Sequence, residues 1–369
     1  GEEIPGTTTG GFPEGGTGTR TSTPTSSGTL PPIGTTVRPG PDGTVTQPQI
    51  EQVTSDPILG VAADQDGRVQ FYNTQDGKFY RLGNNGRPEL LSDEVFYNVQ
   101  NVTWAPGTTE SSIIEYPDGS NIYYNFNTKT QVTLPKHWEN FSFSSQGDKI
   151  AAKSIGYSPE NRFLITSNPD GTEVSIIEPL GNNADKVRVD WSPNKQIVAF
   201  SGTGIPLGGD RQQILPIGLN GENFKGLIVE GRDFRSEWSP EGKKIIYSVY
   251  NAENNFKPQL WVDIAEGDAI GSGRKLLNVN TWADKCAFAD ERFVYCGVPE
   301  QLPTGAGFAP GLADNISDRL YRIDIQTGAK SELPLETPHV IQQIFLGPDG
   351  RSVYFTDKNE TGVFRVPNL

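Results

Sequence analysis

Two histidines are the residues best suited to acid–base or metal chemistry, because the chain contains only His137 and His339. An imidazole titrates near neutral pH, so a pair of them could exchange protons with a substrate or bind a metal ion. Neither lies in an H-x-x-H or H-E-x-x-H sequence. We therefore interpret both as hydrogen-bonded loop histidines, and we predict no metal site, no cofactor and no catalytic residue.

The only two cysteines, Cys286 and Cys296, flank the segment CAFADERFVYC. A three-residue turn at 290–292 would place them opposite each other on two antiparallel strands, a spacing that permits a cross-strand disulfide. A disulfide would indicate an oxidising compartment, whereas two small buried thiols fit the same spacing. There is no C-x-x-C pair to support zinc binding or dithiol redox chemistry.

Other motifs with a known chemistry are missing from the sequence. It has no G-x-S-x-G nucleophile elbow and no glycine-rich phosphate-binding loop. The run from Asp64 to Gly67 begins like a calcium loop but lacks the remaining ligand positions, and is predicted to be a hairpin turn.

The chain is acidic, with 45 Asp and Glu against 31 Lys and Arg in 369 residues, and a formal net charge of −14. A phosphate backbone needs clustered Lys and Arg, so this balance argues against nucleic acid as a partner and against a polybasic membrane-surface module. No run approaches 18 apolar residues, so no membrane-spanning segment is expected. The acidity is expected to serve solubility, and we predict a monomer.

Residues 1–47 differ from the rest in composition. They are rich in Gly, Thr, Ser and Pro, and cannot bury enough apolar surface to offset the entropy of ordering. We expect a disordered tether, with low-complexity filler as the alternative. Because the chain begins at Gly1 and contains no Met, we expect a processed form whose N-terminal anchor, its only link to a membrane, has been removed. The expected location is extracytoplasmic, in the periplasm or at the cell surface.

From residue 48 onwards the sequence contains a repeat. Each copy has an aromatic residue, two small or turn residues, a tight turn and an alternating apolar run. The copies are TWAPGTTESSIIEY, SFSSQGDKIAAK, DWSPNKQIVAF, EWSPEGKKIIYSV, CAFADERFVYC, IFLGPDGRSVYFT and, more weakly, GVAADQDGRVQFY. Each copy predicts two strands joined by a turn, followed by a third strand and in most copies a fourth.

Four strands per unit is the pattern of a propeller blade. Seven blades would use about 46 residues each, within the range of such repeats, whereas six would leave one copy without a blade and eight fit less well. The last copy supplies three strands, so Gln49–Ser55 is predicted to add the fourth and remove the open edge strands. The sequence thus predicts an all-β, seven-bladed β-propeller over residues 48–369.

The sequence WSPEGKKIIY at Trp238–Tyr247, with variants at Trp191 and Trp104, resembles the TolB-like, or PD40, class of WD40-like propeller repeats. The resemblance covers residues 56–369 and extends to N-terminally tethered bacterial propeller proteins. It implies the fold but no single activity, because such blades occur in periplasmic scaffolds, in lids of serine peptidases and in some lyases. Those peptidases carry a separate α/β-hydrolase domain, for which no residues remain here.

Long connections are expected to gather on one face of the propeller. Strands alternate in direction, so the connections before each first strand share a face with those between second and third strands. The latter are long in the third to sixth copies, and segment 297–318 is the longest. Binding sites usually form on such loops, although idle insertions are the alternative. The side chains predicted to line this face are Tyr157, Asp210, Arg211, Tyr250, Lys257 and Phe308.

Polar residues at the starts of the inner strands are expected to point into the central channel. They are Arg188, Arg235, Asp284 and Lys285, together with Asn140 and Gln343. Both histidines precede an innermost strand and are placed on the same face. A mixed-charge ring could bind a small anion or a peptide terminus, or it could be a solvated lining with salt bridges between blades.

Three functions fit this pattern. The favoured one is a non-catalytic binding or scaffold propeller that recruits a protein, peptide or glycan on the face with the long loops. A propeller lyase or hydrolase would need a base that titrates near neutral pH beside Arg or Lys, and His137 and His339 are the candidates. The third is a structural protein of a cell surface.

Overall fold

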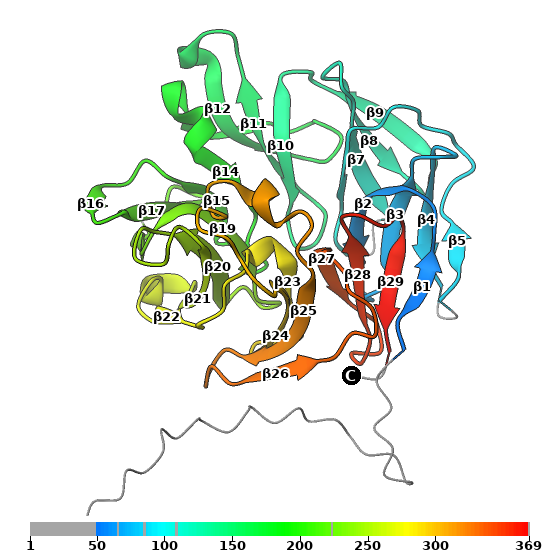
Figure 1. Ribbon diagram of the computed structural model, residues 1–369. Coiled ribbons are helices and arrows are strands. Elements are labelled where there is room, and N and C mark those ends of the chain that lie inside the picture. The colour runs from blue at the N-terminus through cyan, green and yellow to red at the C-terminus, as the bar shows by residue number, and fades with distance from the viewer. Residues whose placement is uncertain (1–48, 65, 84–85, 108–109, 223, 368–369) are drawn as a thin grey trace, which may run out of the picture. The chain divides into compact units, whose positions relative to one another are not determined.

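The computed structural model describes residues 49–367 except 65, 84–85, 108–109 and 223. These residues form seven antiparallel sheets arranged as a ring of blades (Figure 1). The predicted all-β, seven-bladed propeller is therefore confirmed. The tether predicted at residues 1–47 lies outside the described residues.

In blades 1 to 3 the chain runs from the innermost to the outermost strand in sequence order. Blade 1 contains β2 (Ile58–Ala63), β3 (Val69–Asn73), β4 (Lys78–Leu82) and β5 (Pro88–Leu90). Blade 2 contains β6 (Asn101–Trp104), β7 (Ser111–Glu115), β8 (Asn121–Asn125) and β9 (Thr130–Leu134). Blade 3 contains β10 (Trp138–Phe143), β11 (Ile150–Ile155), β12 (Arg162–Ser167) and β13 (Ser175–Pro179).

Blade 4 departs from the predicted four strands. Its strands are β14 (Val187–Val189), β15 (Ile197–Ser201), β16 (Pro206–Gly208), β17 (Arg211–Gly218) and β18 (Leu227–Val229). The segment predicted as a loop between its second and third strands contains β16, which pairs with the start of β17. Because β17 is eight residues long, it extends beyond β15 and leaves room for this extra strand.

Blades 5 and 6 return to four strands. Blade 5 contains β19 (Arg232–Trp238), β20 (Lys244–Tyr250), β21 (Pro258–Ile264) and β22 (Lys275–Leu276). Blade 6 contains β23 (Cys286–Phe288), β24 (Phe293–Pro299), β25 (Asp318–Asp324) and β26 (Lys330–Leu333). Cys286 and Cys296 are register partners on β23 and β24 and form a disulfide.

Blade 7 joins the two ends of the described chain. Its order from the centre is β27 (Ile341–Leu346), β28 (Val353–Asp357), β29 (Val363–Val366) and β1 (Glu51–Thr54). β1 pairs antiparallel with β29, with Glu51 opposite Arg365 and Gln52 opposite Phe364. The ring is therefore closed by hydrogen bonds between segments about 310 residues apart, which leaves no open break between blades.

Among the described residues, five short 3₁₀ turns lie between the strands. They are η1 (Pro159–Asn161), η2 (Gly181–Lys186), η3 (Gly267–Ala269), η4 (Ala283–Lys285) and η5 (Pro310–Ala313). Within the described part of the chain, no helix has the length and apolar character needed to cross a membrane.

The repeated aromatic-Ser element forms the turn after the first strand and ties neighbouring blades together. The hydroxyl oxygen of Ser239 accepts a 2.9 Å hydrogen bond from the backbone N–H of Lys244, which begins β20. The preceding Trp238 donates its indole N–H to a carboxylate oxygen of Asp190 in blade 4 at 2.9 Å. This copy thus closes its own turn and fixes blade 5 to blade 4.

Apolar clusters fill all seven junctions between blades. At the junction of blades 5 and 6, Ile246 packs with Val294 and neither side chain is exposed. At the junction of blades 7 and 1, Val363 packs with Phe71. The second strand of a blade is covered on both faces by neighbouring blades. Its residues are therefore buried in an unbroken run, as in β15, and do not alternate strictly between core and solvent.

One face of the propeller carries the long connections; we call it the loop face. It holds the connections between second and third strands, including 156–161, 202–210, 251–257 and 300–317, and those that precede each first strand. In blade 7, β27 leaves this face, β28 returns, β29 leaves again and β1 runs back toward it. The chain therefore enters β1 from the opposite face.

Gly362 gives a direct test of ring closure. It lies in the β28–β29 connection at φ +95°, and a Cβ there would lie 1.7 Å from the carbonyl oxygen of Thr54 in β1. Gly362→Ala should lower the free energy of unfolding by about 3–5 kcal/mol, because the clash pushes β1 away. Gly350→Ala is the matched control: its φ is +60° but a Cβ meets nothing within 4 Å, so a loss of only about 1 kcal/mol is expected. Equal losses in urea denaturation would contradict this account of closure.

Candidate functional site

The longest connection of the loop face is residues 300–317, between β24 and β25; we call it the strap. It has a small core of its own, in which Leu302, Ala306 and Ala313 pack on the buried Trp282 at the end of the preceding connection. The strap is therefore a packed cover over blade 6, and only parts of its outer surface, such as Phe308, are exposed.

On one side the strap is fixed to blade 5. Gly305 and Gly307 donate backbone hydrogen bonds of 2.9 and 2.7 Å to the carbonyl oxygens of Asn255 and Phe256. Phe256 has φ +53°, an uncommon backbone conformation for an aromatic residue. The Phe308 ring lies 5.7 Å from the Phe256 ring in an edge-on contact, and 6.1 Å from Tyr250.

On the other side the strap is fixed to blade 7. Asp314 forms an ion pair with Lys358, and its carbonyl oxygen accepts a 3.0 Å hydrogen bond from the side chain of Asn359. The strap therefore begins and ends in blade 6 and holds both neighbouring blades. Such a cover needs little further ordering when a ligand binds beneath it.

A cavity of about 530 Å³ lies at the mouth of the channel beside the strap; we call it the channel-mouth cavity. Its walls come from the first strands of blades 1, 2, 5 and 7, from η4 and from the strap. The polar side chains that line it are Asn101, Arg235, Asp284, Lys285, Gln342, Gln343 and Lys358, together with Asp314 of the strap. The amide of Asn101 donates a hydrogen bond to Glu115.

The cations of this cavity are paired with carboxylates. Arg235 contacts Asp284 of the next blade and Asp233 of its own blade, each at 2.9 Å. Lys285 is buried and contacts both carboxylate oxygens of Asp318 at 2.7 Å. By contrast, Gln342 and Gln343 are exposed, and no hydrogen bond of their amides is found among the described residues. These two amides are the polar groups that remain available to a ligand.

The Lys285–Asp318 pair also supports the strand that carries these amides. Asp318 accepts a 2.7 Å hydrogen bond from the backbone N–H of Ile341, the residue before Gln342. Burial raises the pKa of Asp318 to about 6, against the opposing effect of Lys285, and lowers the pKa of Lys285. A buried pair of this kind fixes geometry more than it adds stability.

Deeper in the ring, inner strands of blades 4 and 5 bring acidic groups together. Burial raises the pKa of Glu237 to about 8, with a further contribution from Asp190 and an opposing one from Arg188. Burial also raises the pKa of Asp190, although Trp238 and Ser236 donate hydrogen bonds to it. Glu237 was not among the predicted site residues, because it lies inside the repeat motif and its acidic neighbour, Asp190, comes from another blade.

The two histidines stand on non-adjacent blades, and the structure does not bring them together. His137 is exposed before β10, whereas His339 is buried before β27. His339 forms a 3.0 Å contact from Nδ1 to Asp357 and another from Nε2 to Thr337. Its ring packs on Phe355.

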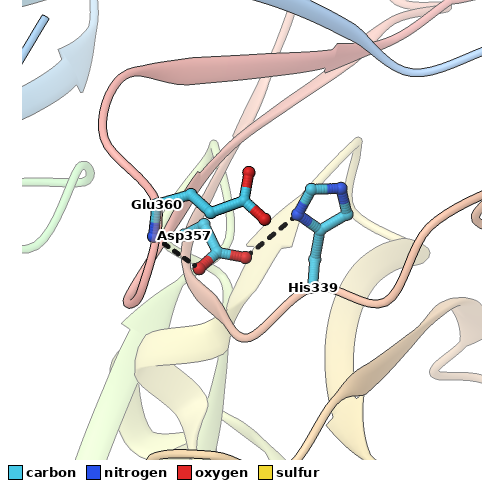
Figure 2. Close-up of side chains that lie close together, drawn as sticks. All are labelled: His339, Asp357 and Glu360. Atoms are coloured by element: carbon cyan, nitrogen blue, oxygen red, sulfur yellow. Dashed lines mark hydrogen bonds and ion pairs between the residues drawn. The ribbon is translucent and has the colours of Figure 1, made fainter. Parts of the chain in front are cut away.

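His339, Asp357 and Glu360 form the one group of possible metal ligands found among the described residues, with ligand atoms within 4.8 Å of one another (Figure 2). Both carboxylate oxygens of Asp357 already accept backbone hydrogen bonds, from Val340 at 2.8 Å and from Asn359 at 2.7 Å. The group is thus explained as a lock between the β26–β27 and β28–β29 connections, and we assign it no metal.

Four of the remaining predicted residues lie around the outer part of the loop face, whereas Arg188 lies on the innermost strand of blade 4, β14. Arg211 lines a second hollow between blades 4 and 5, and Asp210 anchors the turn beside it through Arg232 at 2.6 Å. Tyr157 is fully exposed in the β11–β12 connection, and Lys257 is half-buried before β21. Arg188 donates a 3.3 Å hydrogen bond to the carbonyl oxygen of Ser236. The predicted residues therefore form no single site: Arg235, Asp284 and Lys285 share the channel-mouth cavity, and Tyr250 and Phe308 meet at the strap.

Comparison with known proteins finds no matching family model and no matching curated protein. Solved structures do match. The β-propeller domain of Cps50 (Swd1) from Myceliophteria thermophila has a TM-score of 0.57 at 8% identity, covering 87% of this chain and 100% of that one. An oligogalacturonate lyase in complex with manganese has a TM-score of 0.56 at 12% identity, covering 87% and 93%.

The tricorn protease also matches, with a TM-score of 0.53 and 12% identity over 88% of this chain. This chain spans only 34% of that protein's length. At such low identities these likenesses show the propeller fold alone. The resemblance to TolB-like repeats stays a prediction from sequence.

Glu237 makes stability depend on pH in a direction that can be tested. Its folded pKa of about 8 lies above the ordinary 4.5, so its contribution to stability is complete below about pH 4.5 and is lost as pH rises through 8. Glu237→Gln should therefore be more stable than the wild type by about 1–3 kcal/mol near pH 9, and equal to it near pH 4.5. Urea denaturation across this range measures the difference. Glu89→Gln on the exposed strand β5 is the matched control, and a difference that grows toward low pH would refute the assignment.

Proposed function

We propose that this chain is a non-catalytic binding or scaffold propeller that holds a protein, peptide or glycan at the channel-mouth cavity of its loop face. One observation carries the proposal: the strap, fixed to blades 5 and 7, stands beside a cavity into which Gln342 and Gln343 present amides that have no partner among the residues the structure describes. An amide both donates and accepts hydrogen bonds, so it suits peptide and sugar ligands alike.

The size and rigidity of the cavity support this role. Ligand pockets commonly have volumes of about 300–1,000 Å³ and are formed before the ligand arrives, and this one measures 530 Å³. Its charged groups are held by partners on neighbouring strands, so their positions are fixed. Binding would therefore lose little conformational entropy on the protein side.

The direction of the chain supports an anchored arrangement. The described chain enters β1 from the face opposite the loop face, which leaves the loop face free of the N-terminal connection. We include in the proposal an extracytoplasmic location and a monomeric state. The Cys286–Cys296 disulfide supports an oxidising compartment, and the net charge of −14 argues against nucleic acid as the partner.

A cavity-filling substitution tests the site. Gln343→Trp should obstruct the channel-mouth cavity without disturbing the core, because Gln343 is exposed. Ligands are first selected with the immobilised full chain from a random peptide display library and a glycan array. Their affinity should fall about tenfold or more in Gln343→Trp, since a lost hydrogen bond and a steric block each cost more than 1 kcal/mol.

Gln131→Trp on the exposed strand β9 is the matched control and should bind as the wild type does. A selected ligand that binds Gln343→Trp with unchanged affinity does not use this cavity. If neither library yields a ligand, the binding role loses its support.

Catalysis is the second candidate, favoured by one observation: a carboxyl with a pKa of about 8, Glu237, lies near Arg188 in the channel. Such a group could donate or accept a proton near neutral pH. Turnover of polysaccharide or peptide substrates by the full chain should then fall about 10²-fold or more in Glu237→Gln. It should survive in Glu89→Gln. Turnover retained by Glu237→Gln would exclude this role for the residue.

A further inference from the structure

A second hollow, separate from the channel-mouth cavity, lies at the outer edge of the loop face between blades 4 and 5. We call it the rim groove; its volume is about 860 Å³. Blade 4 contributes the end of β16, the turn at Gly209 and the first residue of β17, Arg211. Blade 5 contributes Glu253, Gln259 and Trp261. No residue lines both hollows.

The blade 4 wall of the groove is a departure from the propeller repeat. The extra strand β16 leads into a turn at Gly209 and Asp210, which both have positive φ. Asp210 holds this turn against blade 5, because its carboxylate contacts Arg232 at 2.6 Å and accepts a 3.2 Å hydrogen bond from the backbone N–H of Ala252. The extra strand is therefore fixed in place as a wall.

The blade 5 wall contains a half-buried aromatic ring. Trp261 is parallel to Tyr247, with centroids 6.5 Å apart and an interplanar angle of 6°. The guanidinium of Arg274 lies 6.0 Å from the same ring and pairs with Glu230 at 2.8 Å. The indole N–H of Trp261 has no hydrogen-bond acceptor within the described part of the chain. This ring is thus held rigidly at the groove.

The polar side chains of the groove fall into two groups. Asn251 and Asn254 are fixed by the protein: the Asn251 amide donates to the carbonyl oxygen of Glu230 at 2.6 Å and accepts from the backbone N–H of Asn254 at 3.0 Å. Arg211, Glu253 and Gln259 differ, since their side chains have no hydrogen-bond or ion-pair partner among the residues described. A guanidinium, a carboxylate and an amide are therefore available at one groove.

We propose that the rim groove binds a neutral oligosaccharide. A sugar ring has an apolar C–H face that packs on aromatic rings, and adjacent hydroxyls that pair with planar groups such as guanidinium, carboxylate and amide. Trp261 supplies the first kind of surface, and Arg211, Glu253 and Gln259 supply the second. Because Glu230 is paired with Arg274, the available charges of the groove are one guanidinium, Arg211, and one carboxylate, Glu253. These two charges balance, so a neutral sugar fits better than an acidic one.

A peptide is a poorer fit to this groove. Peptides bind sheets chiefly by adding a strand to an exposed edge, but the outermost strand of blade 5, β22, is only two residues long. The free groups of the groove are also side chains instead of backbone groups. A peptide ligand is therefore an outcome that would count against the proposal.

The full chain is tested on a glycan array with neutral and acidic oligosaccharides, and titrated calorimetrically with maltohexaose, cellohexaose and mannohexaose. We expect saturable binding of at least one neutral hexasaccharide. Arg211→Ala and Gln259→Ala should each weaken it by about tenfold, the effect of losing one or two hydrogen bonds to an exposed ligand. Both residues lie at the surface of the groove, so the variants should fold normally.

Arg351→Ala and Gln131→Ala, at exposed positions on the β27–β28 turn and on β9, are the matched controls and should bind as the wild type does. Gln343→Trp in the channel-mouth cavity should also leave this binding unchanged, which separates the two sites. The proposal is overturned if no neutral glycan binds, if only acidic sugars or peptides bind, or if binding is unaffected by Arg211→Ala and Gln259→Ala.

Discussion

The antiparallel pairing of β1 with β29 is the interaction on which the rest of the molecule depends. All seven junctions between blades are apolar, and each blade is held by the blade on either side. Without β1, blade 7 would expose the edge of β29 and weaken its packing against blade 1. Closure is achieved by a few backbone hydrogen bonds, and the absence of a side chain at Gly362 permits the close approach of its connection to Thr54. A small strand thus completes a large cooperative unit.

A closed ring allows one face to vary freely. The inner strands fix where each connection begins and ends, so additions to the loop face do not disturb the core. Two additions have produced hollows: the strap, which spans three blades beside the channel mouth, and β16, which walls the rim groove. Each added segment is fixed to a neighbouring blade by an ion pair. Asp314 joins the strap to Lys358 of blade 7, and Asp210 joins the turn after β16 to Arg232 of blade 5. The hollows are therefore as rigid as the scaffold beneath them.

The fold could be predicted from sequence because its determinants are local and repeated. Ser239 accepts a hydrogen bond within its own turn, and Trp238 donates one to the adjacent blade. Because this motif occurs about once per blade, the number of copies in the sequence predicts the number of blades. The candidate sites could be predicted only as a face, because their geometry depends on pairs from different blades. The partner of Lys285 is Asp318, across a strand and a long connection, and the high pKa of Glu237 depends on burial inside the ring. Neither the pairing of Lys285 with Asp318 nor the burial of Glu237 corresponds to a regular residue spacing that a sequence pattern could reveal.

The position of β1 also determines how the propeller would respond to mechanical load. It is the outermost strand of blade 7, and the chain enters it at the face opposite the loop face. A pull between Gln49, where the described chain begins, and the connections of the loop face would run roughly along β1, so the hydrogen bonds between β1 and β29 would share the force in shear instead of opening one at a time. The strand that closes the ring is therefore also the element through which tension would pass.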